Sequence, residues 1–266
     1  MDLLLLLFLS LTLSAVAATA AHHDHLLPRP LIIDPLPETL LSDPFDDDPF
    51  LVCNAWRFAG EANNLSPWKT IPPECAAFVA DYATGRAYAV DLEMVAREAG
   101  AYARDVGLGG DGMDAWVFDV DETLISNLPY YAEHGFGLEV FNVHEFDKWV
   151  DKASAPAIPS SLKLYKEILD LGIKIVLLTG RSEGQRHVTI YNLNNAGYEN
   201  WEKLILRGEN DHGKTATTYK SEKRSELEIE GYRILGNSEI TIRSCEENVV
   251  KPCGLSFLLF LFALFE

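Results

Sequence analysis

The segment from Trp116 to Leu124 constrains the fold of this 266-residue chain more than any other part of the sequence. It begins with the apolar run Trp-Val-Phe, which is typical of a buried strand in a parallel sheet. The run ends at two carboxylates spaced i, i+2, Asp119 and Asp121, and the hydroxyl of Thr123 follows two residues later. Open α/β sheets bind ligands outside the carboxyl ends of their strands. The segment therefore predicts an α/β fold with a polar site where this strand ends.

The two aspartates suggest a specific chemistry. If the backbone is extended here, Asp119 and Asp121 point to the same side, so both can reach one metal ion or one phosphoryl group. One carboxylate can attack phosphorus to form an aspartyl-phosphate, while the other protonates the leaving alcohol. A purely structural role, as a polar strand end or as a cap on the next helix, also accounts for such residues. Taken alone, the segment leaves both interpretations open.

Two later segments repeat the pattern of an apolar strand that ends in polar groups. Residues 174–178 run into Thr179-Gly180-Arg181, and residues 232–235 run into Gly236-Asn237-Ser238. Residues 201–207 predict a further strand. Helices are predicted over residues 90–102, 161–171, 185–196 and 218–230, and the second of these is expected to turn Leu162, Tyr165, Ile168 and Leu169 inward.

In this order and spacing, the segments resemble the haloacid dehalogenase (HAD) superfamily, and within it the class B-like plant acid phosphatases and vegetative storage proteins. The resemblance covers about residues 51–238. It implies a Rossmann-like core with a parallel sheet at residues 111–238, a small cap inserted at 126–160 and an N-terminal helical extension at 51–110. We expect the aromatic residues of this extension to pack a helical layer onto the sheet rather than to form a ligand platform. It also implies Mg²⁺-dependent hydrolysis of small phosphomonoesters, and it is compatible with a homo- or heterodimer. The cap is rich in aromatic rings, which we expect to form mainly its own core, with contacts to the leaving group as the alternative.

The resemblance also assigns roles to single residues. It implies that Asp119 is the nucleophile and that Asp121 is the general acid, which later becomes the base that activates water. Asp119 would bind Mg²⁺ through its side chain, and Asp121 through its backbone carbonyl. The phosphate-binding residues would be Thr179, Gly180 and Lys220, with Lys223 as the second candidate for the lysine. A helical lysine is ordinarily solvated, so the choice of Lys220 depends on the resemblance.

The chain departs from this family after Ser238. The family continues with Gly-Asp and with a second Asp a few residues later, and these carboxylates complete the Mg²⁺ shell. This chain continues instead with Glu239, Ile240 and Thr241. Because Mg²⁺ requires oxygen ligands in near-octahedral geometry, and Glu239 is one residue early and longer, we expect impaired metal affinity and turnover. A vegetative storage protein with little or no catalysis is therefore the alternative function, although the retained Asp119 counts against it.

Composition limits the partners. The formal net charge is -18 and the pI is about 4.7, so the long-range field repels nucleic acid and anionic membranes. A phosphorylated substrate must then be attracted by local cations rather than by the surface as a whole.

The N-terminal segment predicts a secretory protein. Residues 1–20 predict a signal peptide, with an apolar run from Leu3 to Leu13 followed by Ala-x-Ala frames, although Asp2 stands where a basic residue is expected. This run is too short for a membrane span, so we interpret it as a signal peptide. A chain with a signal peptide enters the secretory pathway, and we therefore expect an extracellular or vacuolar protein. Residues 21–50, rich in His, Pro and Asp, predict a disordered propeptide or linker, with metal binding by the histidines as the alternative. Residues 239–266 form an atypical apolar tail, which we interpret as an exposed, aggregation-prone end rather than a lipid-anchor signal.

Four cysteines suggest two disulfides, Cys53 with Cys75 and Cys245 with Cys253, although the sequence proves neither pairing. Their spacings differ from the tight pairs of metal sites, and a secretory route permits disulfides. Asn64-Leu65-Ser66 is a glycosylation sequon, weakened by the proline that follows it.

Overall fold

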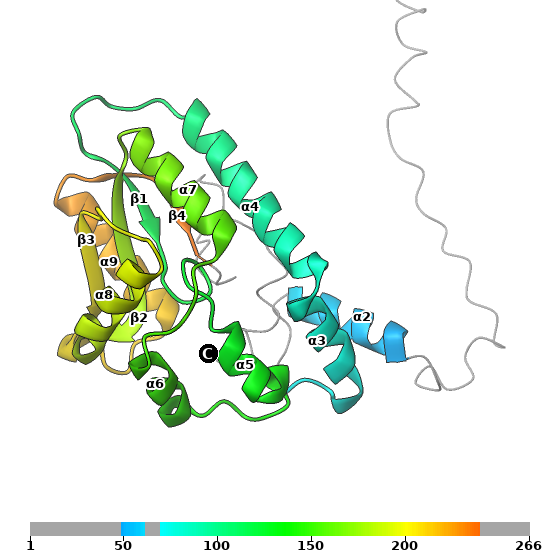
Figure 1. The fold of residues 1–266 in the computed structure, drawn as a ribbon. Coiled ribbons are helices and arrows are strands. Elements are labelled where there is room, and N and C mark those ends of the chain that lie inside the picture. Colours follow the sequence, from blue (N-terminus) through cyan, green and yellow to red (C-terminus); the bar gives the residue numbers. More distant parts are fainter. Residues whose placement is uncertain (1–48, 62–69, 240–266) are drawn as a thin grey trace, which may run out of the picture. The chain divides into compact units, whose positions relative to one another are not determined.

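The computed structural model describes residues 49–61 and 70–239, and the side chains of residues 49–57 and 70–239. Their centre is a parallel sheet of four strands in the order β3-β2-β1-β4 (Figure 1). The strands are β1 (Asp114–Phe118), β2 (Lys174–Ser182), β3 (Lys203–Arg207) and β4 (Arg233–Ser238). The predicted α/β class with a parallel sheet is confirmed. β2 includes Thr179, Gly180 and Arg181, in agreement with the predicted strand that ends in these residues, and extends one residue further to Ser182.

Strand β1 is buried on both faces. Trp116 and Phe118 belong to the hydrophobic cluster on one face of the sheet, and Ala115 and Val117 belong to the cluster on the other. This alternation follows from the two-residue period of a strand. All five residues of β1 are buried, as is typical of a central strand with helices on both sides.

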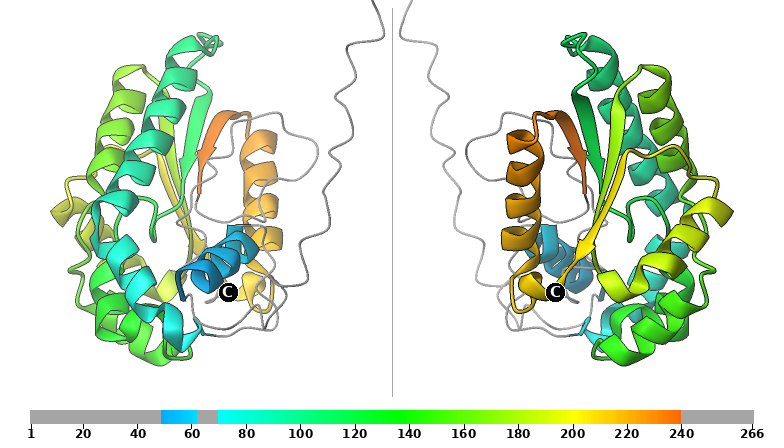
Figure 2. Two further views of the ribbon diagram at one scale, coloured as in Figure 1. Left: turned by 90° about the vertical axis from the view of Figure 1, so that its right-hand side faces the viewer. Right: turned by 90° about the vertical axis from the view of Figure 1, so that its left-hand side faces the viewer.

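Helices cover both faces of the sheet (Figure 2). Helices α4 (Arg86–Asp105), α7 (Pro159–Asp170) and α8 (Arg186–Asn195) contribute to the cluster with Trp116, and α9 (Ala216–Ile229) contributes to the cluster with Val117. Of the predicted inward residues of α7, Tyr165 and Ile168 are buried, while Leu162 and Leu169 are partly buried and pack against the cluster. Leu164, which was not predicted to face inward, is also buried.

A close contact at Gly236 explains one residue of the third predicted segment. A Cβ atom at this position would lie 2.5 Å from the ring of Trp116, so only glycine fits without displacing the ring. The indole Nε1 of Trp116 then donates to Ser238 Oγ at 2.9 Å. Gly236 and Ser238 therefore both contact Trp116 and hold the end of β4 close to β1.

The N-terminal extension differs from its predicted packing. It comprises α2 (Pro49–Glu61), a 3-10 turn η2 (Pro73–Cys75), α3 (Ala76–Thr84) and α4. The aromatic residues of this region were expected to pack onto the sheet, but Trp56, Tyr82 and Tyr88 form a separate cluster. Only the later turns of α4 reach the sheet, since α4 has 20 residues and is therefore about 30 Å long. A disulfide joins Cys53 of α2 to Cys75 of η2.

The predicted cap region contains two short helices, α5 (Leu128–Glu133) and α6 (Val143–Asp151), separated by a 3-10 turn, η3 (Gly135–Gly137). Their rings contact one another, with Tyr130 beside Tyr131, Phe146 and Trp149. Tyr130, Tyr131 and Trp149 also belong to the hydrophobic cluster that contains Trp116, and Phe146 packs against it. The rings therefore form core, as expected, but this core is continuous with that of the sheet rather than confined to the cap.

Several predictions concern residues outside the described ranges. These are the signal peptide, the linker up to residue 48, the glycosylation sequon, the tail from residue 240 and the pair Cys245 and Cys253. The linker prediction was two residues too long, since α2 begins at Pro49. None of the helices in the described ranges has the length and apolar character of a membrane span.

Candidate active site

Asp119 lies directly after β1, where the sequence places the nucleophile. Its backbone N–H donates to the carbonyl of Ser238 at 2.9 Å, and its Oδ1 accepts from the N–H of Val120 at 2.7 Å. Its Oδ2 is 3.0 Å from Nζ of Lys220, which projects from α9 and is 4% exposed. A lysine is buried to this degree only when it is paired, so the sheet end and α9 are joined by a buried ion pair.

The ammonium of Lys220 has a second carboxylate partner. Glu239 Oε1 lies 2.6 Å from Lys220 Nζ, and Glu239 Oε2 receives Arg224 at 3.4 Å and the Asn237 amide at 3.2 Å. Arg224 follows Lys220 by four residues on α9, so both side chains lie on one face of the helix. Lys220 therefore lies between two carboxylates, those of Asp119 and Glu239.

Asp121 pairs with a different cation, Arg181. Arg181, at the end of β2, forms two hydrogen bonds with its carboxylate, from Nη2 to Oδ1 at 2.7 Å and from Nε to Oδ2 at 2.9 Å. The Asn127 amide donates to Oδ1 at 3.0 Å, and Arg181 also donates to Thr189 at 3.2 Å. The guanidinium is held rigidly, because a two-pronged pair fixes its plane.

These partners give the two aspartates opposite pKa shifts. Burial raises the pKa of Asp119 to about 6; Lys220 opposes this rise, and the charges of Glu239 and Asp121 add to it. Burial also raises the pKa of Asp121, but the charge and hydrogen bonds of Arg181 outweigh it and hold that pKa below its usual value. In this arrangement Asp121 is ionised, so the predicted role of general acid requires its contact with Arg181 to loosen.

Thr179 and Gly180, two further predicted phosphate-binding residues, differ in their exposure to solvent. The register places Leu177 beside Phe118, so Thr179 lies at the same edge of the sheet as Asp119, fully buried. Its Oγ1 accepts from the backbone N–H of Arg181 at 3.2 Å. Gly180 is exposed, and a Cβ there would meet no atom within 4 Å, so its backbone faces open space.

Lys223 is not brought to Asp119. Its ammonium pairs with Glu226 at 3.0 Å and lies 3.9 Å from Asp211. On a helix, Lys223 is rotated about 60° from Lys220 in one direction, and Arg224 about 40° in the other. Of the two candidate lysines, the structure therefore brings Lys220 rather than Lys223 to Asp119, and Arg224 approaches Glu239 beside it.

Carboxylate oxygens are the side-chain ligands that Mg²⁺ prefers. Within residues 49–57 and 70–239, no three His, Cys, Asp or Glu side chains are grouped so that they could hold a metal. The carboxylates of Asp119, Asp121 and Glu239 are each paired with a cation. Among the described residues, the side chains therefore do not form a set that fits Mg²⁺.

Glu122 was missed by the sequence analysis. It is buried, with a positive φ of 54°, and accepts hydrogen bonds from the backbone N–H of Asn127 and, at 3.5 Å, from the Ser126 hydroxyl. Burial raises the pKa of Glu122 to about 8, although the hydrogen bonds from Asn127 and Ser126 oppose this rise. The acid next to Asp121 is therefore neutral at the pH of most cell compartments.

Arg181 and Arg224 were also not assigned as site residues. Arg181 could have been found as the charge that ends a buried strand, and Arg224 from its four-residue spacing to Lys220. Asn127, which orients Asp121, has no comparable signal in the sequence.

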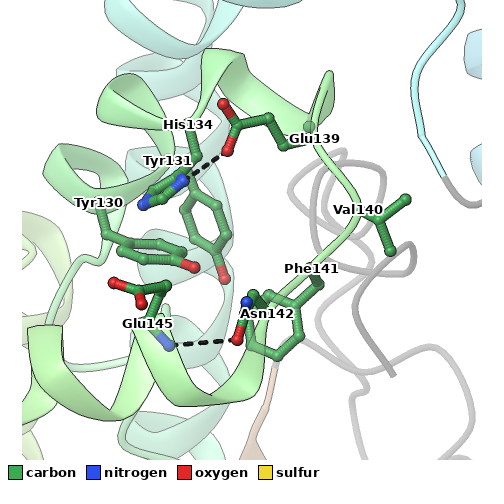
Figure 3. A pocket seen from close by; sticks show the side chains of 9 residues that line it. Tyr130, Tyr131, His134, Glu139, Val140, Phe141, Asn142 and Glu145 are labelled. Atoms are coloured by element: carbon green, nitrogen blue, oxygen red, sulfur yellow. Dashed lines mark hydrogen bonds and ion pairs between the residues drawn. The ribbon is translucent and has the colours of Figure 1, made fainter.

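A cavity of about 150 Å³ lies in the cap (Figure 3). The ring of Tyr130 lies between His134 and Glu145, and His134 pairs with Glu139 at 2.7 Å. Tyr131 also lines this cavity; burial, followed by the charges of Glu122 and Asp121, raises its pKa. Tyr131 thus lies between the cap cavity and the acids of the strand end.

Comparisons with known proteins agree with this geometry. Residues 41–239 match the family model described as HAD superfamily, subfamily IIIB (Acid phosphatase). The chain is 58% identical over 233 residues to "Acid phosphatase 1" of Solanum lycopersicum, covering 87% of this chain and 89% of that protein. It is 36% identical over 187 residues to "Vegetative storage protein 1" of Arabidopsis thaliana, covering 70% and 69%.

A solved structure shows the same fold. The class C acid phosphatase from Bacillus anthracis, with tungstate bound, matches with a TM-score of 0.51 and 24% identity, covering 64% of this chain and 70% of that one. This similarity supports the fold alone, whereas the family model and the sequence relatives identify the family. The chain belongs to subfamily IIIB of the HAD superfamily, the acid phosphatases, and has vegetative storage proteins among its relatives.

Proposed function

We propose that this chain hydrolyses small phosphomonoesters slowly, through an aspartyl-phosphate on Asp119. The observation that carries the proposal is the buried pair of Asp119 and Lys220 at the carboxyl end of the central strand. A nucleophilic carboxylate needs a neighbouring cation, because a phosphate dianion that approaches to about 4 Å is repelled by on the order of 4 kcal/mol per charge pair at an effective dielectric constant of 20. Lys220 reduces this repulsion, and Thr179 and Gly180 are the proposed contacts of the phosphoryl oxygens.

The reaction has two steps. The carboxylate of Asp119 attacks phosphorus and the ester P–O bond breaks, while Asp121 transfers a proton to the leaving oxygen. Water then attacks the acyl phosphate, Asp121 takes up its proton, and inorganic phosphate and free Asp119 are formed. Because Arg181 holds Asp121 in its ionised form, the first step requires this ion pair to loosen, which we expect to slow the leaving-group step.

Low turnover is also expected because the described side chains do not form a Mg²⁺ site. HAD enzymes generally use Mg²⁺, which neutralises charge in phosphoryl transfer, but the described donor set does not fit it. We therefore propose that Mg²⁺ stimulates this chain weakly or not at all.

Phosphate release from a chromogenic monoester at pH 5 tests the proposal. The wild-type chain, Asp119→Asn and the surface variant Glu226→Gln are compared with and without Mg²⁺. We expect slow release by the wild-type chain and by Glu226→Gln, and none by Asp119→Asn. Equal background from all three chains would contradict an enzymatic role.

A storage protein is the second candidate. The observation that favours it is the pairing of Lys220 with Glu239, which leaves the proposed phosphate-binding ammonium between two carboxylates. Vegetative storage proteins of Arabidopsis thaliana are among the relatives. On this interpretation the fold is retained as an amino-acid reserve, and the assay above would show no release that depends on Asp119.

We also propose that the chain enters the secretory pathway and works outside the cell or in the vacuole. The disulfide between Cys53 and Cys75 supports this location, because disulfides persist in oxidising compartments. A relative from Glycine max, "Stem 28 kDa glycoprotein", is 42% identical over 189 residues, which is consistent with the same route. The acidic charge again favours a small phosphomonoester over nucleic acid as the partner.

A further inference from the structure

Glu239 lies directly after β4, and its side chain is 4% exposed. Both of its carboxylate oxygens are used. Oε1 lies 2.6 Å from the ammonium of Lys220, and Oε2 receives the guanidinium of Arg224 at 3.4 Å and the amide of Asn237 at 3.2 Å. Glu239 is therefore a bound ligand of three donors rather than a solvated acid.

The donors around Glu239 are those that bind a phosphoryl group. Ammonium, guanidinium and amide N–H groups donate to phosphate oxygens with the same geometry as to a carboxylate. An ionised carboxylate accepts hydrogen bonds only, as the oxygens of a phosphate dianion do. An anion that approaches Lys220 from this side thus meets a position already filled.

We infer that the Glu239 carboxylate is an internal substitute for phosphate, which occupies an anion site formed by Lys220, Arg224 and Asn237 and excludes phosphate from it. The inference rests on the proposed function only in taking Lys220 as the phosphate-binding group. It assigns two further phosphate-binding residues, Arg224 and Asn237. It also gives a physical reason for slow turnover that is independent of metal binding.

The charges of the site support exclusion. At pH 7, Asp119 and Glu239 carry two negative charges, and Lys220 and Arg224 carry two positive charges, so the group is neutral. The neighbouring pair of Asp121 and Arg181 is neutral as well. An incoming phosphate therefore finds no excess positive charge here, whereas removal of the Glu239 charge leaves one.

Binding of inorganic phosphate to the full chain tests the inference, measured by isothermal titration calorimetry. Glu239→Gln removes the charge and keeps the shape, and Glu239→Ala also opens the space. Glu226→Gln is the matched control, because it removes one carboxylate charge from the exposed side of α9, the helix that carries Lys220 and Arg224. We expect both Glu239 variants to bind phosphate at least 10-fold more tightly than the wild-type chain, and the control to bind as the wild-type chain does.

Further variants identify the donors. In the Glu239→Ala chain, Lys220→Met is expected to abolish the gained binding, and Arg224→Gln to weaken it several-fold. Thermal melting establishes that each variant is folded. Unchanged or weaker phosphate binding by both folded Glu239 variants would overturn the inference, and unchanged binding after Arg224→Gln would overturn the assignment of Arg224.

A Mg²⁺ titration separates this inference from a metal-binding role of Glu239. We expect no Mg²⁺ binding by the wild-type chain. If the wild-type chain bound Mg²⁺ and Glu239→Gln did not, Glu239 would be a metal ligand and the inference would be wrong. If the Glu239 variants gained phosphate binding but showed no hydrolysis dependent on Asp119, the inference would stand and the proposed function would fall.

Discussion

Asp119 and Asp121 are the same residue type two positions apart, yet their surroundings are opposite. Asp119 shares one ammonium from α9 with a second carboxylate, whereas Asp121 receives a two-pronged contact from the guanidinium of Arg181 on β2. The pKa of Asp119 is raised to about 6, and that of Asp121 is lowered. The difference shows that the chemistry of the Asp-x-Asp segment is decided by the cations that the neighbouring elements supply.

Removal of the shared ammonium should have the largest effect. In Lys220→Met, the buried carboxylates of Asp119 and Glu239 lose their common cation, which should lower the free energy of unfolding by about 3–5 kcal/mol. Urea denaturation at pH 7 measures this change. The matched variant Lys223→Met, three residues along the same helix, should cost less than about 1 kcal/mol. A similar loss in both variants would mean that the pair of Asp119 and Lys220 has no special stabilising role.

Glu122 extends the comparison to a third buried carboxyl group. It accepts hydrogen bonds, but no cation is among its contacts in the described residues. Its pKa is raised from 4.5 to about 8, so the folded state binds a proton that the unfolded state releases. Stability contributed by this proton is present below pH 4.5 and is lost as the pH rises through 8. Between pH 5 and 7 the loss should be about 2.5 kcal/mol.

The variant Glu122→Gln isolates this effect. It keeps the shape of the side chain and removes the titration, so its free energy of unfolding should vary less with pH than that of the wild-type chain by the same amount. Urea denaturation at several pH values gives both curves. Parallel curves would show that Glu122 has an ordinary pKa.

The two-pronged contact of Asp121 can be changed without removing its charge. Arg181→Lys keeps a cation but loses the fork geometry, so it should cost about 1–2 kcal/mol of stability and raise the pKa of Asp121 toward its ordinary value. Carboxyl-carbon NMR titration of the wild-type chain and of the variant follows the pKa of Asp121. An unchanged Asp121 pKa would show that charge alone, not geometry, sets its ionisation.

The smallest expected effect comes from the cap. Trp149 Nε1 donates to Asn127 Oδ1 at 2.8 Å, and the Asn127 amide in turn donates to Asp121. Trp149→Phe removes this donor while keeping an aromatic ring, so it should cost about 1 kcal/mol or slightly more. The Asp121 pKa should rise slightly in the same NMR titration. No change in that pKa would mean that Asn127 is held without the help of Trp149.

The strands themselves and the position of the candidate site after the first of them could be predicted from the sequence, because apolar runs that end in polar groups are local features. The burial of Trp116 and Phe118 and the place of Asp119 after β1 follow directly from such a run. The packing of the N-terminal aromatics could not be predicted in this way. Tyr88 lies near the start of α4 and packs in the separate cluster, whereas Ala103 near the end of α4 packs in the cluster of the sheet. Which residues of α4 reach the sheet depends on where this long helix crosses it, and a local pattern does not contain that position.

The partners of the site residues were predictable only in part. The pairing of Lys220 with Asp119 joins residues 101 positions apart, and only the family resemblance indicated it. The choice between Lys223 and Arg224 depends on a rotation about the helix axis that spacing alone leaves open. The engagement of Glu239 by Lys220 and Arg224 requires the positions of β4 and α9 together, which no local pattern contains.

The most direct test of the account is the covalent state of Asp119 during turnover. The full chain is mixed with a phosphomonoester, quenched in acid and mapped by peptide mass spectrometry, with Asp119→Asn as the control. The account predicts a phosphoryl group on Asp119 in the wild-type chain and none in the control. Phosphate release without a phosphoryl group on Asp119, or with one on another residue, would contradict it.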